Sequence, residues 1–152
     1  MVFRIYTEKK RGFDFEAKNL LGYIKNYISV EPDTEVRLFD RYDFDGVSKE
    51  EFDVIAKKII VDENSDNSFI DYLPLTAGWK SFALSPIDGS FNEKLFNLKK
   101  TARAYGVVGS YKIKYARVIA FSGLVSDFKL EEIKELLIDK KFNVIADNNK
   151  PL

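Results

Sequence analysis

Alternating apolar and polar residues predict three strands in the first half of the chain. Val2 to Glu8 alternates in this way, and so does a longer segment from Val36 to Phe44 that ends at Gly46. A short strand is expected at Phe69 to Leu73, after a polar loop at 62–68. Between the strands, apolar residues recur at helical spacing, first at Ala17, Leu20, Leu21, Ile24 and Ile28, then at Phe52, Ile55, Ala56, Ile59 and Ile60.

The second half repeats this order of elements after the turn-forming segment 74–78. Strands are expected at Lys80 to Ser85, at Tyr111 to Phe121 and at Val144–Ile145. The two intervening helices would turn inward the side chains of Phe91, Leu95, Leu98, Ala102 and Tyr105, and of Leu130, Ile133, Leu136 and Leu137.

Two capping boxes mark helix starts in the sequence. Ser48 precedes Glu51, and Ser90 precedes Glu93, at the spacing in which the serine hydroxyl and the glutamate satisfy each other's backbone N–H groups. Gly106, with Gly109 three residues later, follows a helix and is typical of a C-cap.

The two halves align with each other at low identity. Gly46 and Gly123 are 77 residues apart, and Phe13 and Phe91 are 78 apart. This spacing indicates two copies of a small β-α-β-α-β unit, at 1–74 and 79–152. We therefore expect an α+β fold of antiparallel sheets, with helices on the outer face and a pseudo-twofold axis. The free sheet faces of the two copies would then pack against each other.

Composition limits the chemistry that the chain can perform. Its 152 residues are 45% hydrophobic and 32% charged, as in an ordinary globular domain, and they include no histidine and no cysteine. Thiolate nucleophiles, imidazole bases and zinc sites built on these residues are therefore excluded. The start of the chain carries charges at Arg4, Glu8 and Lys9 to Arg11 instead of an apolar run. We therefore expect no signal peptide and no membrane span, and we expect a cytoplasmic protein.

The zero net charge is the sum of two unlike halves. Residues 1–76 hold 11 basic and 16 acidic side chains, whereas residues 77–152 hold 13 and 8. Attraction between the halves, or toward a partner, explains this asymmetry, and so does an accident of solvated faces. The neutral total argues against a dedicated nucleic-acid or membrane-binding module.

The string from Asp43 to Phe52 is similar to part of a calcium-binding loop, but its spacing is wrong for one. With Gly46 in the sixth position, the first ligand would be Arg41 and the twelfth Phe52, where a bidentate glutamate is needed. We expect a tight strand-to-helix turn there, and no metal site.

The remaining candidates for chemistry also have simpler interpretations. No phosphate-binding glycine loop is present, and carboxylate pairs such as Asp40 with Asp43, or Glu131 with Glu132, come with no nucleophile. The run Lys9-Lys10-Arg11 could hold an anion, although a charged strand end is the usual explanation. One region combines basic and aromatic residues, as some RNA-binding sheets do: Lys94, Lys99, Lys100, Arg103, Lys112, Lys114 and Arg117, with Tyr105, Tyr111 and Tyr115.

Two segments resemble the N-terminus of large single-chain phosphoribosylformylglycinamidine synthases of the clostridial type. The first contains Glu8-Lys9-Lys10, Gly12-Phe13-Asp14 and Glu16, and the second contains Arg41-Tyr42-Asp43 and Gly46. The resemblance covers residues 3 to about 60 well. It weakens beyond them, where the segment from Leu84 to Phe91 and the pair Asn143–Val144 depart from the family pattern.

The resemblance implies a non-catalytic role within a larger enzyme. In that family the N-terminal domain is similar to a fused dimer of the small subunit of the multi-subunit enzyme. It helps to hold the synthetase and glutaminase domains of the same polypeptide together for ammonia transfer. The whole enzyme is a glutamine amidotransferase and ligase of purine biosynthesis, for which ATP and magnesium are expected as cofactors.

From the sequence we therefore predict a scaffold domain that has no catalytic, cofactor-binding or metal-binding residue of its own and that is inactive in isolation. Its expected partners are the synthetase and glutaminase domains, with no nucleic acid and no membrane. The alternative is an independent ferredoxin-like module that binds RNA or a small ligand through the basic second half.

Overall fold

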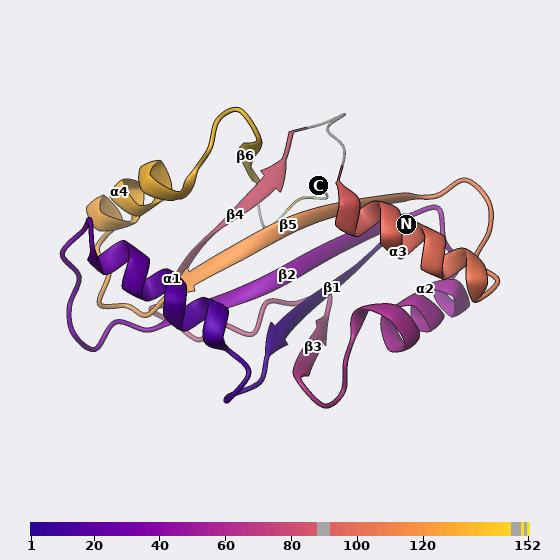
Figure 1. Ribbon diagram of the computed structural model, residues 1–152, viewed down its shortest axis with the longest axis horizontal. Helices are drawn as coiled ribbons and strands as arrows, with labels where there is room; N and C mark the ends of the chain where they lie inside the picture. Colours follow the sequence, from indigo (N-terminus) through magenta and orange to yellow (C-terminus); the bar gives the residue numbers. More distant parts are fainter. Residues whose placement is uncertain (88–91, 147–149, 151) are drawn as a thin grey trace.

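The computed structural model describes residues 1–87, 92–146, 150 and 152, and these form an α+β fold built on one six-stranded antiparallel sheet (Figure 1). Strand and helix alternate along the chain in the order expected from the hydrophobic pattern. The elements are β1 (Val2–Lys9), α1 (Phe15–Lys25), β2 (Val36–Asp45), α2 (Lys49–Ile55), a π-helical turn η1 (Ala56–Ile60), β3 (Asp66–Ile70), β4 (Lys80–Pro86), α3 (Glu93–Ala104), β5 (Lys112–Phe121), α4 (Asp127–Leu137) and β6 (Asn143–Ala146).

The two halves of the chain meet edge to edge in this sheet. The strand order is β3-β1-β2-β5-β4-β6, so the first three strands occupy one side and the last three the other. Strands β2 and β5 join the sides through ten register pairs, from Val36 opposite Phe121 to Asp45 opposite Lys112. The expectation that two free sheet faces pack against each other is therefore wrong, because the long central strands bond through their backbones instead.

All four α-helices of the described chain lie over one face of the sheet, α1 beside α4 and α2 beside α3 (Figure 1). Each pair covers an apolar cluster, and each cluster draws on both halves of the sequence. Phe52 and Ile55 of α2 are buried with Leu98 and Ala102 of α3. On the other side, Ile24 of α1 is buried with Ile133 and its neighbours on α4.

The opposite face of the sheet carries no helix from the described ranges but is also covered. Tyr6, Phe39 and Val118 are fully or almost fully buried there. Side chains from the connection between the halves pack against them, namely Leu73, Leu75 and Trp79, together with Leu152. Loop segments thus supply the second apolar layer that the sheet requires.

The predicted capping signals are confirmed at two helix ends and wrong at a third. Ser48 and Glu51 form the full capping box of α2. After α3, Gly106 adopts φ +87°, and its N–H and that of Val107 bond back to Arg103 and Ala102, as in a Schellman motif. However, α3 begins at Glu93 with Asn92 as its N-cap, not with the expected capping box of Ser90. Ser90 and Phe91 lie outside the described residues.

One strand boundary also differs from the expectation. Strand β3 begins at Asp66, within the segment expected to be a polar loop, and ends at Ile70 before the expected Leu73. Its residues pair with β1 from Ile5 to Lys9. Strand propensity depends on context, and this edge pairing with β1 outweighs the polar composition of 66–68.

Within the ranges given above, no helix has the length and apolar character needed to cross a membrane.

Candidate functional site: a charged cleft between the helix pairs

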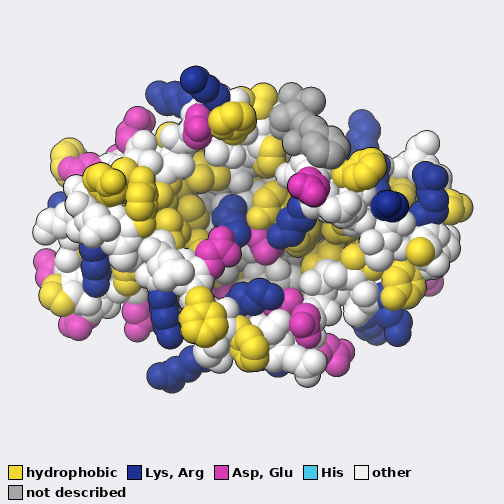
Figure 2. All heavy atoms as spheres, viewed as in Figure 1, with side chains coloured by type: hydrophobic (Ala, Val, Ile, Leu, Met, Phe, Trp, Pro, Cys, Tyr) yellow, Lys and Arg dark blue, Asp and Glu magenta, His cyan; other side chains and the backbone are white. Residues whose placement is uncertain are grey.

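A cleft of about 1020 Å³ lies on the helix-covered face, over β1, β2 and β5 and between α1 and α3. Figure 2 shows the face hollowed between the two helix pairs, with charged side chains on the floor of the hollow. We call it the central cleft. Its volume is at the upper end of the range for small-molecule sites.

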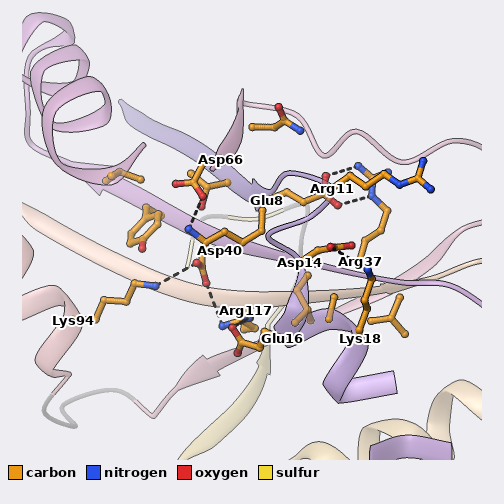
Figure 3. Close-up of a pocket in the computed structure, with 18 of the residues that line it drawn as sticks. Glu8, Arg11, Asp14, Glu16, Lys18, Arg37, Asp40, Asp66, Lys94 and Arg117 are labelled. Atoms are coloured by element: carbon orange, nitrogen blue, oxygen red, sulfur yellow. Dashed lines mark hydrogen bonds and ion pairs between the residues drawn. The ribbon is translucent and has the colours of Figure 1, made fainter. Parts of the chain in front are cut away.

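Asp40 is the centre of the polar network in the central cleft. Its Oδ1 accepts a hydrogen bond of 2.6 Å from the Tyr115 hydroxyl. The Lys94 ammonium lies 3.3 Å from Oδ2, and a guanidinium nitrogen of Arg117 lies 3.6 Å from Oδ1. Figure 3 shows Lys94 and Arg117 converging on this carboxylate. Three donors from the second half of the chain thus meet one acceptor from the first.

The strand pattern already places these residues. Val36, Leu38, Tyr42 and Phe44 form the apolar face of β2, and Asp40 interrupts them at the same parity. Arg117 interrupts the corresponding face of β5, and the register of the sheet sets it directly opposite Asp40. A charged residue at an inward position of an alternating strand was therefore the available signal. Sequence reasoning set Asp40 aside because it lacked a nucleophile.

Burial and charge shift the pKa values of the groups on the cleft floor. Burial, with the Asp40 carboxylate nearby, raises the pKa values of Tyr115 and Tyr42 well above the ordinary tyrosine range. Burial alone would lower the pKa of Arg117, but Asp40 and Glu16 outweigh it and raise that pKa. The two tyrosines are therefore neutral hydrogen-bonding groups at physiological pH, and Arg117 is a fixed cation.

Further ion pairs line the rim of the central cleft. Glu16 of α1 pairs with Arg117 at 2.8 Å, and Lys9 of β1 pairs with Asp66 of β3 at 2.7 Å. Glu8 pairs with Arg37 through two contacts of 2.7 Å. In total, six acidic and six basic side chains line the cleft, so it offers no excess charge of either sign. Such a lining suits a partner of mixed charge better than a polyanion.

Thr34, at the end of the central cleft before β2, has a different kind of polar group. Only 4% of Thr34 is exposed, and its hydroxyl has no hydrogen-bond partner among the described residues. A buried hydroxyl without a partner costs free energy. No feature of the sequence singled out this residue.

The second family-like segment is split between the two faces of the sheet. Tyr42 lies on the cleft floor, whereas Arg41 and Asp43 are buried on the opposite face, where they form an ion pair with N–O distances near 3.0 Å. Arg4 joins this pair at 3.0 Å. Asp40 and Asp43, which the sequence offered as a carboxylate pair, therefore point to opposite faces, as strand parity requires.

The other residues of the two segments shape turns and surface. Lys10 donates to the backbone oxygen of Glu63, and Phe13 is half exposed. Asp14 accepts from the N–H of Gly12, which adopts φ +92°. Gly46 adopts φ +91° in the expected strand-to-helix turn between β2 and α2. The structure thus brings Glu8, Lys9, Asp14, Glu16 and Tyr42 together at the central cleft, but not Lys10, Gly12, Phe13, Arg41, Asp43 or Gly46.

The basic and aromatic region does not form one surface. Lys94 of α3 lies 4.8 Å from the centre of the Tyr115 ring, and Lys99 lies 4.9 Å from that of Tyr111. Lys112 and Lys114 have the strand parity of Ala116, which is buried on the face without helices. Because lysines cover the rings of Tyr111 and Tyr115, these rings do not offer the free faces on which bases stack.

The network is suited to holding surfaces together. Five of the six carboxylates that line the central cleft form ion pairs, and the Tyr115 hydroxyl, which donates to Asp40, has a raised pKa and is therefore not activated as a nucleophile. In the described part of the chain, no group of three or more acidic side chains is arranged to bind a metal ion. The chain matches no protein-family model and no curated protein sequence.

Proposed function

We propose that the chain is a non-catalytic scaffold domain of a single-chain phosphoribosylformylglycinamidine synthase, an enzyme of purine biosynthesis. In this proposal it holds the synthetase and glutaminase domains of the same polypeptide in place for ammonia transfer. ATP and magnesium belong to those other domains. The observation that carries the proposal is the mirrored arrangement of the two halves around the junction of β2 and β5.

The strand order supports an origin by duplication. Reading β1, β2 and β3 as the counterparts of β4, β5 and β6 makes the order β3-β1-β2-β5-β4-β6 identical from either edge. Asp40 and Arg117 face each other in register and are 77 residues apart, the same separation as Gly46 and Gly123. A pseudo-twofold axis through this pair would exchange the helix pairs α1–α4 and α3–α2. This is the arrangement that a fused dimer would have.

The distribution of charge between the two halves also supports a fused dimer joined at β2 and β5. Three ion pairs cross between the halves, Asp40 with Lys94, Asp40 with Arg117 and Glu16 with Arg117, and in the described residues each joins an acid of the first half to a base of the second. On the sheet, Asp43 and Asp45 of β2 also lie opposite Lys114 and Lys112 of β5. Opposite charges in facing positions stabilise an antiparallel pair. The asymmetry of charge is therefore explained by attraction between the halves.

Sequencing the gene beyond the codon for Leu152 tests the proposal. We expect the reading frame to continue through a linker into synthetase motifs, and later into a glutaminase domain with a cysteine nucleophile. A stop codon directly after Leu152, with no synthetase gene alongside, would count against the scaffold role.

A further inference from the structure

The floor of the central cleft carries buried hydroxyl groups that the scaffold role does not use. Two of them belong to Thr7 of β1 and Tyr42 of β2, which line the cleft and are 7% and 4% exposed. Like Thr34 at the end of the cleft, neither hydroxyl has a hydrogen-bond partner among the described residues. A buried hydroxyl costs free energy unless it is hydrogen-bonded, so these groups are suited to a partner that enters the cleft.

The register of the sheet places both hydroxyls beside Asp40. Thr7 lies directly opposite Asp40 on the neighbouring strand, and Tyr42 is the next residue of β2 with the same parity. On the other neighbouring strand, Arg117 lies opposite Asp40. Thr7, Asp40 and Arg117 therefore form one polar row across three strands, and we call it the polar row. Apolar side chains of the same face lie on both sides of it.

The charged groups around the polar row are already paired with one another. Asp40 is 3.3 Å from the Lys94 ammonium and 3.6 Å from the Arg117 guanidinium. Nearby, Lys9 and Asp66 are paired at 2.7 Å. A charged ligand would have to separate such a pair and leave a partly buried charge without its counter-ion. The cleft therefore favours a ligand without net charge.

We infer that the central cleft binds an uncharged, polyhydroxylated small molecule, which is the chemistry of a sugar. Each hydroxyl of such a ligand both donates and accepts, so it can bond the carboxylate of Asp40 on one side and the ammonium of Lys94 on the other. The hydroxyls of Thr7 and Tyr42 supply further donors and acceptors next to them. A volume of about 1020 Å³ is ample for such a molecule. This inference is independent of the proposed function, because it rests only on the lining of the cleft.

Titration of the full chain with sugars, followed by nuclear magnetic resonance of the backbone amides, tests the site. The probes are ribose, glucose and maltose, each up to about 100 mM, which detects millimolar dissociation constants. Inorganic phosphate and spermidine serve as charged comparators. We expect at least one sugar to shift the amide signals of Thr7, Asp40 and Tyr42 in a saturable manner. No saturable shift with any of the three sugars, or tighter binding of phosphate or spermidine at these amides, would overturn the inference.

Thr7→Val and Tyr42→Phe remove the two hydroxyls and keep the shape of each side chain. Each should weaken binding of the responding sugar about two- to tenfold, which corresponds to one hydrogen bond between uncharged groups. Neither should lower the melting temperature, because the hydroxyls make no hydrogen bond to a described residue. Unchanged sugar affinity in both variants, or a loss of affinity accompanied by a lower melting temperature, would overturn the role of the hydroxyls in binding.

Tyr6→Phe is the matched control. Tyr6 precedes Thr7 on β1 and is buried to the same degree as Tyr42, but its side chain lies on the opposite face of the sheet. Its replacement should leave the sugar affinity unchanged. Equal weakening by Tyr6→Phe and Tyr42→Phe would overturn the placement of the ligand in the central cleft.

Discussion

Asp43 shows how one residue links several parts of the molecule. Its carboxylate accepts from two arginines and from the Leu152 backbone, while it lies on the strand at the centre of the sheet. Burial alone would raise its pKa, but these hydrogen bonds outweigh burial and lower the pKa below the ordinary aspartate value. The ionised form is therefore the one that stabilises the fold.

Asp43→Asn is expected to lower the free energy of unfolding by about 3 kcal/mol, because it leaves Arg41 buried without its anion. Since the folded pKa is lowered, this stabilisation is fully present above the ordinary aspartate pKa of about 3.9 and is lost as the pH falls through the folded value. Urea unfolding between pH 7 and pH 2 checks both points. The variant should lose part of the acid sensitivity, and an unchanged profile would refute the role of Asp43.

Gly46 is required by its backbone conformation and by the space beside it. It adopts φ +91°, and a Cβ there would lie 3.3 Å from the backbone oxygen of Ser110. We expect Gly46→Ala to destabilise the fold by about 1–3 kcal/mol. Gly22→Ala is the control with the opposite sign, because its site in α1 is open and alanine favours a helix by up to about 1 kcal/mol. Thermal unfolding of both variants measures the difference in stability. Equal shifts of the melting temperature would contradict the requirement for glycine at position 46.

At the level of elements, the sequence predicts the strands and helices well. Alternation locates β1, β2 and β5 to within one or two residues, because one face of each is covered by helices. It fails at β3, where the edge strand is polar, and at the start of α3, where Asn92 forms the cap in place of Ser90. Pairing partners and competing caps are decided by tertiary contacts, which the local pattern does not contain.

The alternating pattern also revealed residues of the candidate site, but it did not show which of them contact each other. Asp40 and Arg117 break the apolar faces of β2 and β5, yet only the register of the sheet shows that they face each other. That register joins residues far apart in sequence, so it could not be derived from either strand alone. Thr34 and the contacts of Arg4 with Lys150 are likewise products of the assembled fold.

The β2–β5 junction is expected to depend on the shared carboxylate of Asp40. Asp40→Asn leaves Lys94, Arg117 and the Tyr115 hydroxyl without their common anion, and should cost about 1–3 kcal/mol. Asp53→Asn is the control, because its partner Lys49 is an exposed neighbour on one helix and the pair is worth at most about 0.5 kcal/mol. Chemical denaturation measures the loss of unfolding free energy in each variant. Equal losses would show that the contacts of Asp40 do not stabilise the β2–β5 junction.

For the whole molecule, the shared apolar clusters imply that the two halves fold together. Each helix pair combines one helix from 1–76 with one from 77–152, so neither half can bury its apolar face alone. We expect each half, produced separately, to lack stable structure, and an equimolar mixture to regain strand and helix signals by circular dichroism. Cooperative unfolding of either half by itself would contradict this interdependence.

In the scaffold role that we propose, the chain contributes to activity only in combination with the catalytic domains. The most direct test is to add the 152-residue chain to a single-chain phosphoribosylformylglycinamidine synthase lacking its N-terminal domain, and to measure amidation with glutamine and with free ammonia. We predict that the chain has no turnover alone, and that it raises the glutamine-dependent rate more than the ammonia-dependent one. Unchanged rates on addition of the chain, or turnover by the chain alone, would contradict the central claim.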